Sequence, residues 1–481
     1  MRYATSPYLP GWEYVPDAEP HVFGERLYVY GSHDRFAGKK FCMNDYVCWS
    51  APLSDLADWR YEGVIYCKEQ DPDNVDGKLE MFAPDVCQGT DGRYYLYYCL
   101  ADHDKLSVAV SNTPAGKYEF YGYVRDKDGN YLGTRAGEKR PFDPAVLVDD
   151  DGRIHLYEGQ SPMDQRMARS RPKMGDYAYH MELEPDMLTL RTQPKPLVPN
   201  YGNSAGTGFE GHEFHEGSSI RKFGGKYYFI YSSVLSHELC WSVSKRPDGG
   251  FRYGGTLVSN GDIGLEGPVP MTFNSKANLK VKNYVGNTHG SVIRLGENYY
   301  VFYHRHTNRH MLSRQGCVTK IQMLPDGSFL QAEMTSCGLA DTLPGKGTFE
   351  ARIACQLYSK MGCVFSAHPM VQNKKHPAFT QDEPDGKDGV QYIANLRDGA
   401  TAVFKYFQLE GSGMITVTVR GKSNGKLLIC AGDTVAAEIA LKPSKQWTKV
   451  SAPFAATSEL TSLAVTYQGP GYADFLDFTI S

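Results

Sequence analysis

Apolar and polar positions alternate with a period of two along most of this chain. The alternation is interrupted by short turns such as Asp91-Gly92, Asp151-Gly152 and Gly224-Gly225. A period of two predicts strands that bury one face, and the Gly- and Asp-rich interruptions are typical of the turns between such strands. No long segment shows the 3.6-residue period of an amphipathic helix. The pattern therefore predicts an all-β protein.

One short phrase, a turn followed by an aromatic and β-branched strand, occurs five times. Its copies begin at Glu25, Gly92, Gly152, Gly225 and Glu297. Successive starts are separated by 67, 60, 73 and 72 residues. This period is typical of the blades of a β-propeller and is too long for a solenoid. We therefore predict a five-bladed β-propeller over residues 1–338.

The phrase stops after its fifth copy, and a segment with Gly and Pro follows at residues 335–347. Beyond it, residues 413–421, 426–432 and 473–481 have the pattern of short strands between frequent turns, which predicts a β-sandwich. A chain of 481 residues also exceeds what one hydrophobic core usually supports. We therefore predict a second domain at residues 339–481.

An acid or a histidine stands seven to nine residues ahead of every copy of the phrase. These residues are Asp17, Asp85, Asp143, Glu216 and His289. If the blades are equivalent, these side chains converge on the central channel. Carboxylates are rarely buried without partners, and several that face one channel repel one another, which raises the pKa of at least one. Two carboxyls with separated pKa values are what general acid–base catalysis requires.

The overall charge and the Cys content exclude some classes of partner. The net charge of -4 gives no electrostatic footprint for nucleic acid or an anionic membrane. No apolar run approaches a membrane span, and the first residues lack the pattern of a signal peptide. The 11 Cys are scattered and odd in number, which is typical of reduced thiols. We expect a cytoplasmic protein, or a secreted one if a signal segment has been removed.

Residues from about Ser6 to Ala332 resemble the family 43 glycoside hydrolases, which are five-bladed propellers that cleave glycosidic bonds with inversion. Five short motifs in chain order carry the resemblance, and they are Pro16-Asp17, Ala83-Pro84-Asp85, Phe142-Asp143-Pro144, Glu216-Gly217 and Asn287-Thr288-His289-Gly290. The resemblance implies that Asp17 is the general base and Glu216 the general acid. It also implies that Asp143 raises the pKa of the acid and orients the substrate. Inversion requires the acid and base carboxyls to stand roughly 6.5–9.5 Å apart, with a water between them.

The same resemblance implies four further site residues. Asp85, in Ala83-Pro84-Asp85, either contacts substrate or only holds the second blade together. Phe82 stands where family members often carry Trp, so the sugar platform differs here. His289 matches a residue on the channel axis near a water or a calcium ion, and Arg314 matches a substrate-binding Arg. The chemistry requires no cofactor, although the resemblance allows calcium beside His289.

Two other features have alternative interpretations. The cluster His304-Arg305-His306, with His310, either lines the mouth of the channel or forms a solvated blade edge. The second domain faintly resembles a family 6 carbohydrate-binding module, and a domain with only a packing role is the alternative. Trp447, the one Trp of that domain, is expected in its core.

The leading functional hypothesis is an inverting exo-glycosidase that hydrolyses pentose glycosides of plant hemicellulose, in arabinoxylan, arabinan or xylo-oligosaccharides. An α-L-arabinofuranosidase is favoured, with a β-1,4-xylosidase as the alternative. A non-catalytic sugar-binding propeller would be expected to lack at least one of the three acids, and all three are present. A protein-interaction propeller of the Kelch or WD type has shorter repeats and needs no acids on its channel. The expected partner is therefore an oligosaccharide or a polysaccharide.

Overall fold

The computed structural model describes residues 4–267, 278, 280–364, 366 and 374–481. Strands dominate this part of the chain, and its single α-helix, α1 (Gln165–Ser170), has only six residues. Within the described residues, no helix has the length and apolar character needed to cross a membrane. The prediction of an all-β fold is confirmed.

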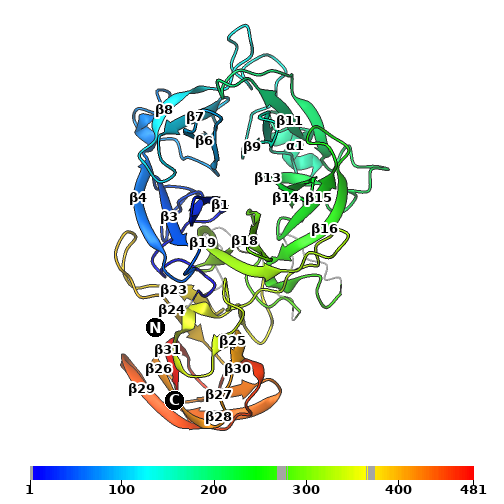
Figure 1. The fold of residues 1–481 in the computed structure, drawn as a ribbon. Coiled ribbons are helices and arrows are strands. Elements are labelled where there is room, and N and C mark those ends of the chain that lie inside the picture. Colours follow the sequence, from blue (N-terminus) through cyan, green and yellow to red (C-terminus); the bar gives the residue numbers. More distant parts are fainter. Residues whose placement is uncertain (1–3, 268–277, 279, 365, 367–373) are drawn as a thin grey trace.

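Five antiparallel sheets are arranged around a central axis as the blades of a propeller (Figure 1). Blade 1 contains β1 (Glu19–Phe23), β2 (Arg26–Tyr30), β3 (Tyr46–Pro52) and β4 (Arg60–Tyr66). Blade 2 contains β5 (Asp85–Gln88), β6 (Tyr94–Cys99), β7 (Leu106–Ser111) and β8 (Glu119–Tyr123). Blade 3 contains β9 (Ala145–Val148), β10 (Ile154–Glu158), β11 (Tyr177–Leu183) and β12 (Lys195–Pro199). Blade 4 contains β13 (Phe214–Phe223), β14 (Lys226–Ser233), β15 (Glu238–Ser244) and β16 (Arg252–Ser259). Blade 5 contains β17 (Val292–Leu295), β18 (Asn298–Thr307) and β19 (His310–Ile321).

The repeated phrase forms the second strand of every blade, namely β2, β6, β10, β14 and β18. Each of these strands pairs with the innermost strand of its own blade. The innermost strands are neighbours around the axis: β1 lies beside β5 and β17, and β9 lies beside β5 and β13. The acid or histidine ahead of each phrase therefore lies on, or just before, an innermost strand. This arrangement confirms the expectation that the five blades are equivalent.

The ring is closed by the N-terminal segment, which lies against the last strand of blade 5. The backbone N–H of Val318 on β19 donates to the hydroxyl of Ser6 at 3.1 Å. The N–H of Ser6 donates in turn to the carbonyl of Ser336, also at 3.1 Å. The two ends of the propeller are thereby joined, which fixes blades 1 and 5 beside each other.

Aromatic and aliphatic side chains fill the space between neighbouring blades. Between blades 2 and 3, for example, Tyr97 and Val108 pack in one cluster with Leu156 and Met181, and all four are fully buried. Strand residues of this type fit a pleated surface that is covered on both sides. The blades are therefore rigid supports for the side chains on the channel.

Two further sheets follow the propeller and pack on each other as a sandwich (Figure 1). One contains β20 (Leu343–Pro344), β22 (Gln356–Tyr358), β25 (Thr401–Gln408), β27 (Lys426–Ala431), β28 (Thr434–Ala440) and β30 (Leu460–Gln468). The other contains β21 (Gly347–Glu350), β23 (Ala378–Thr380), β24 (Tyr392–Leu396), β26 (Gly413–Gly421), β29 (Ser444–Phe454) and β31 (Ala473–Ile480). The three segments predicted as strands are thus β26, β27 and β31.

The expectation that Trp447 belongs to the core of the sandwich is wrong. Ala452 and Phe454 of the same strand are buried in the core, so the alternation along β29 turns Trp447 to the outer face. There its ring is half-buried beneath the guanidinium of Arg420, 4.3 Å from the ring centroid. The period-two pattern of the strand, rather than the residue type, determines which way this Trp points.

A buried arginine joins the propeller to the sandwich. Arg305 on β18 donates to the carbonyl of Arg352 at 2.8 Å and to the side chain of Gln391 at 3.2 Å. Its guanidinium also lies 3.7 Å from the ring centroid of Phe379. Burial lowers the pKa of Arg305 to about 10. The charge of this side chain is therefore satisfied only while the two parts of the chain stay in contact.

Candidate active site

Asp17, the predicted general base, lies two residues before β1 and is 4% exposed. Its backbone has a φ of 56°, in the left-handed region that residues other than Gly seldom adopt. Nη1 of Arg314 donates to its Oδ1 at 2.9 Å, and Nδ1 of His304 lies 3.2 Å from the same oxygen. Two side chains of blade 5 therefore hold the carboxylate of a residue from blade 1.

These two partners decide the ionisation of Asp17. Burial alone would raise the pKa of its carboxyl, because a charged group is destabilised away from water. The positive charge of Arg314, and then the hydrogen bond and charge of His304, outweigh burial and hold the pKa of Asp17 well below its usual range. Asp17 is therefore an ionised carboxylate near neutral pH, which is the state a general base requires.

Arg314 is itself fixed by a second acid. Its side-chain Nε and Nη2 donate to the two oxygens of Asp34 at 2.9 and 3.0 Å. The backbone N–H of Arg314 donates to the same carboxylate. The ring of Phe41 packs on the guanidinium, with its centroid at 4.7 Å. Arg314 is only 3% exposed. The structure therefore places it behind Asp17, and direct contact with substrate stays a prediction.

Glu216, the predicted general acid, lies on β13 where the pairing with β14 is irregular. A bulge of this kind changes the direction of the Glu216 side chain from the one that regular alternation along the strand would give it. The amide of Gln160 donates to Oε2 of Glu216 at 2.8 Å. The side chain of Glu216 is 19% exposed, against 6% for the side chains of Asp17 and Asp143. Of these three acids, Glu216 is the one that solvent or a ligand reaches most readily.

Asp143 is brought next to the acid by the backbone of blade 4. The N–H of Gly217, the residue after Glu216, donates to Oδ2 of Asp143 at 3.0 Å. Gly217 has a φ of 77°, and a Cβ at this position would lie 3.2 Å from the ring of His289. Like Asp17, Asp143 has a left-handed backbone, with a φ of 44°. Strained backbone of this kind is concentrated at functional sites.

The pKa of Asp143 is raised well above its usual value. Burial is the first cause, and the negative charges of Glu216 and Asp17 are the next two. Asp143 therefore keeps its proton to a higher pH than an isolated Asp does. The site thus combines an ionised carboxylate, Asp17, with a carboxyl of raised pKa, Asp143.

His289 lies before β17, between an acid of blade 3 and an acid of blade 1. Its Nδ1 is 3.8 Å from Oδ2 of Asp143, and its Nε2 is 3.8 Å from Oε1 of Glu19. Neither His289 Nε2 nor Glu19 Oε1 has a hydrogen-bond partner among the described residues. One carboxylate oxygen and one imidazole nitrogen fall short of the six to eight oxygens that Ca²⁺ takes, so the protein alone does not form a calcium cage here. The chemistry proposed for this site therefore has no step that depends on calcium.

The other predicted site residues have contacts within the protein. Asp85 is fully buried, and its carboxylate lies 2.7 Å from Nε2 of His21 and accepts the N–H of Val146 at 2.8 Å. These contacts join blade 2 to blades 1 and 3, and they favour the structural alternative for Asp85. Phe82 packs on Phe142, the neighbour of Asp143, with ring centroids 5.2 Å apart. Contact of Phe82 with a sugar stays a prediction.

Sequence reasoning missed Asp34, which holds Arg314, and Gln160, which holds Glu216, and it named His304 only as part of a cluster at the channel mouth or at a blade edge. The alternative that the histidine cluster forms a solvated blade edge is wrong, because His304, His306 and His310 are all buried. His304 and His306 lie on β18, which is paired on both edges by β17 and β19, and His310 is the first residue of β19. Asp34 and Gln160 lie in the loops after β2 and β10, nine and eight residues after the starts of their copies of the phrase, so this nearly common position was the signal that could have indicated them.

Taken together, the fold and the site define a hydrolase that uses carboxyl groups on a five-bladed propeller. The chain belongs to glycosyl hydrolase family 43, whose family model matches residues 13–329. This match confirms the family resemblance for the propeller and leaves the sandwich outside it. The likeness of the sandwich to a family 6 carbohydrate-binding module stays a prediction.

One relative matches almost the whole chain. A xylosidase/arabinosidase of Thermoclostridium stercorarium is 49% identical over 479 residues, which are 99% of this chain and 98% of the relative. A β-xylosidase of Xylanibacter ruminicola is 26% identical and covers 61% of this chain and 88% of the relative. The solved arabinoxylan arabinofuranohydrolase of Bacillus subtilis matches 98% of this chain and 96% of its own, with a TM-score of 0.50 at 17% identity. An exo-β-1,3-galactanase from Phanerochaete chrysosporium matches 97% and 96%, with a TM-score of 0.52 at 13% identity. At these identities the structural matches establish the fold alone.

Proposed function

We propose that this protein is an inverting exo-glycosidase that removes terminal pentose residues from hemicellulose fragments, with α-L-arabinofuranosidase activity favoured. The observation that carries the proposal is that the acids of the site have pKa values shifted in opposite directions. Arg314 and His304 hold the pKa of Asp17 low and keep it ionised, whereas burial and the charge of Glu216 raise the pKa of Asp143. A base and an acid are thus available at the same pH, as hydrolysis with inversion requires.

In this scheme each proton transfer is assigned to a side chain. Glu216 donates its proton to the leaving oxygen, which leaves as a hydroxyl group. Asp17 takes a proton from a water that attacks the anomeric carbon from the opposite face, so the anomeric configuration inverts. Asp143 lies beside the acid through its contact with the N–H of Gly217 and orients the substrate, and Gln160 orients the carboxyl of Glu216. Both proton transfers are carried by carboxyl groups, so the scheme requires no cofactor.

The substrate class is supported by the names of relatives. The chain is 49% identical to a protein named xylosidase/arabinosidase, and a more distant relative is named β-xylosidase. These names favour pentose substrates and make β-1,4-xylosidase activity the second candidate. We assign the catalysis to a domain of residues 1–338 and no proton transfer to residues 339–481.

The test compares 4-nitrophenyl α-L-arabinofuranoside with 4-nitrophenyl β-D-xyloside, followed by arabinoxylan oligosaccharides. We expect turnover of at least one aryl glycoside, and proton NMR of the first product should show inverted anomeric configuration. A product with retained configuration would contradict the assigned roles of Asp17 and Glu216. Binding of both sugars without turnover would favour a non-catalytic propeller.

A further inference from the structure

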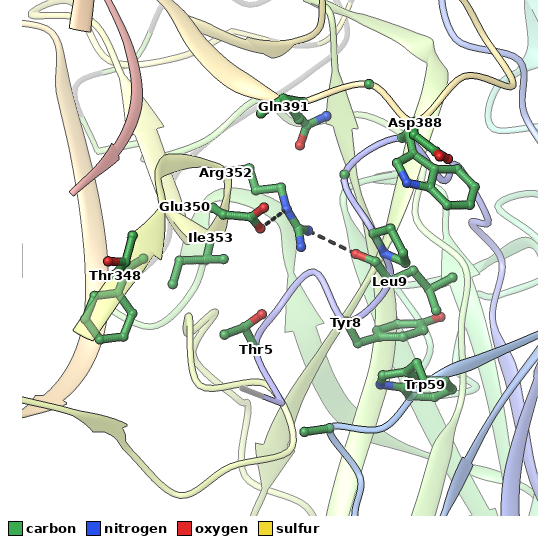
Figure 2. Close-up of a pocket in the computed structure, with 17 residues that line it drawn as sticks. Thr5, Tyr8, Leu9, Trp59, Thr348, Glu350, Arg352, Ile353, Asp388 and Gln391 are labelled. Carbon is green, nitrogen blue, oxygen red and sulfur yellow. Dashed lines mark hydrogen bonds and ion pairs between the residues drawn. The ribbon is translucent and has the colours of Figure 1, made fainter. Parts of the chain in front are cut away.

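A second hollow lies away from the channel, where the N-terminal segment of the propeller meets the sandwich (Figure 2). It has a volume of about 630 Å³, within the range of about 300–1,000 Å³ typical of small-molecule sites. Residues 5–12, 57–59, 348–353 and 388–391 supply its lining. None of the acids of the candidate active site belongs to this lining.

One wall of the cavity is aromatic. Trp12 and Trp59 line it and are each half-buried, and Tyr8 packs against Trp59 with ring centroids 5.0 Å apart. Nε1 of Trp59 is buried and has no hydrogen-bond partner among the described residues. Indole rings present a flat apolar face together with a single donor. This wall therefore suits a ligand that has both apolar C–H faces and hydrogen-bond acceptors.

The opposite wall carries a fixed arginine. Arg352 is 8% exposed, and its Nε donates to Glu350 at 2.6 Å while its Nη1 donates to the carbonyl of Leu9 at 3.0 Å. Figure 2 shows this guanidinium between Glu350 and Leu9. No hydrogen bond from its Nη2 is found within the described part of the chain. The side chain is thus held in place by two of its nitrogens and keeps further N–H donors for a ligand.

Charge in the cavity favours a neutral ligand. Arg352 is the one cation in the lining, and Glu350 and Asp388 are both acidic. A site for phosphate or a polyanion would need an excess of positive charge, which these residues do not provide. Asp388 is exposed and lines the same cavity, so its carboxylate offers acceptor oxygens to a ligand there. Donors, an acceptor and aromatic faces together match the hydroxyl groups and C–H faces of a sugar.

We propose that this cavity is a second binding site, distinct from the catalytic channel, for one or two residues of a neutral sugar. We expect the sugar to be a pentose, and this expectation rests on the proposed function. Trp12 and Trp59 stack on the apolar face of the sugar, Arg352 donates to its hydroxyl oxygens, and Asp388 accepts from a hydroxyl group. The carbonyl of Arg352 also accepts from Arg305, so a ligand here contacts the residues that join the two domains.

The test is a calorimetric titration of the inactive Asp17→Asn protein with xylobiose, and separately with L-arabinose. We expect two sites per chain, and Trp12→Ala and Arg352→Gln in the same background should each remove one site or weaken it at least tenfold. The Trp control is Trp447→Ala, whose side chain lines a neighbouring pocket that shares Asp388 and Val390 with this cavity but not its Trp wall, and it should leave the catalytic site unchanged. In the otherwise native enzyme, the Trp12 and Arg352 changes should leave kcat on a small aryl glycoside within twofold.

Three outcomes would overturn the proposal. They are a single site in the Asp17→Asn protein, two sites that persist in both cavity variants, and binding of inorganic phosphate in preference to xylobiose. If Arg352→Gln fails to fold, as judged by circular dichroism, Asp388→Ala replaces it, because that exposed side chain holds no part of the interface together. Failure of the proposed catalytic function would instead appear as lack of turnover by the native enzyme, whatever the number of binding sites.

Discussion

Asp385 of the sandwich accepts a hydrogen bond from the side chain of Asn44 of the propeller, with 3.0 Å between Oδ2 and Nδ2. Its other oxygen accepts the N–H of Phe36 at 2.6 Å. The same Nδ2 of Asn44 also donates to the carbonyl of Asp34 at 3.0 Å, and Asp34 holds Arg314. A side chain of the second domain is therefore connected through this loop of blade 1 to the arginine that holds Asp17.

Replacement of Asp385 by Ala should lower kcat/KM about tenfold, because loss of two hydrogen bonds of roughly 1 kcal/mol each loosens the loop. The acid limb of the pH–rate profile should also move to higher pH, since a less fixed Arg314 depresses the pKa of Asp17 less. Glu383→Gln, an exposed change in the same loop, is the control and should shift neither quantity. An unshifted acid limb in the Asp385 variant would limit this residue to a role in stability.

Asp17→Asn should abolish hydrolysis of every substrate, because an amide cannot take a proton from the attacking water. Added azide should restore turnover and give a glycosyl azide of inverted configuration, which mass spectrometry and NMR would detect. Retention of more than a small fraction of activity would show that Asp17 is not the base. Glu19 would then be the next acid to test, although burial raises its pKa to about 8.

Glu216→Gln should slow hydrolysis of a natural sugar–sugar bond by roughly 10²–10⁴-fold, since protonation of a poor leaving group is lost. A dinitrophenyl glycoside leaves without such help and should lose far less activity. The two substrates are compared at one pH with the same variant. Equal slowing of both would mean that Glu216 binds substrate and that another acid donates the proton.

Asp143→Asn should move the alkaline limb of the kcat/KM profile to lower pH. The two carboxyls lie close enough that, after burial, the charge of Glu216 raises the pKa of Asp143, and the Asn variant leaves the acid without this neighbouring carboxyl. The rate should therefore fall at a lower pH than in the native enzyme. An alkaline limb that stays at the same pH would show that Asp143 does not influence the ionisation of the acid. Its main role would then be to accept the hydrogen bond from the N–H of Gly217.

Glu158→Gln should stabilise the folded protein at alkaline pH. Burial raises the pKa of Glu158 to about 8, and its one described hydrogen bond comes from the N–H of Phe142. Because the folded pKa is raised, this carboxyl favours folding fully below its unfolded pKa of about 4.3, and that contribution is lost as the pH rises through about 8. The variant should match the native protein at pH 4 and exceed its free energy of unfolding by a few kcal/mol at pH 9. Chemical denaturation at both pH values measures the free energy of unfolding of the two proteins. The same difference between variant and native protein at pH 4 and at pH 9 would contradict the prediction.

The sequence was most informative where one physical pattern repeats. Alternation along the strands and the recurring phrase predicted the five blades, and the acid ahead of each phrase predicted Asp17, Asp143 and Glu216 as neighbours of the channel. The same argument also gave Asp85, whose carboxylate is used for contacts between blades. Position in the repeat thus indicates nearness to the axis, but it does not separate catalytic from structural acids.

Partners that depend on folding could not be read from the sequence. Arg314 lies 297 residues after Asp17, and Asp385 lies 341 residues after Asn44. Neither pair has a local spacing that would indicate contact. Trp447 shows a different source of error. Its residue type suggested burial in the core, whereas its position on β29 places it on the outer face of the sandwich. Contacts between loops and between domains require the three-dimensional arrangement.

Arg305 makes the two domains a single unit of unfolding. A chain that ended at residue 338 would lose the carbonyls of Arg352 and Ala354, the side chain of Gln391 and the ring of Phe379. The guanidinium would keep Gln315 as a partner but would be exposed to water on the side that the sandwich now covers. Calorimetry of the full chain should accordingly show one cooperative transition. The shorter chain should melt earlier and expose an apolar patch that promotes aggregation.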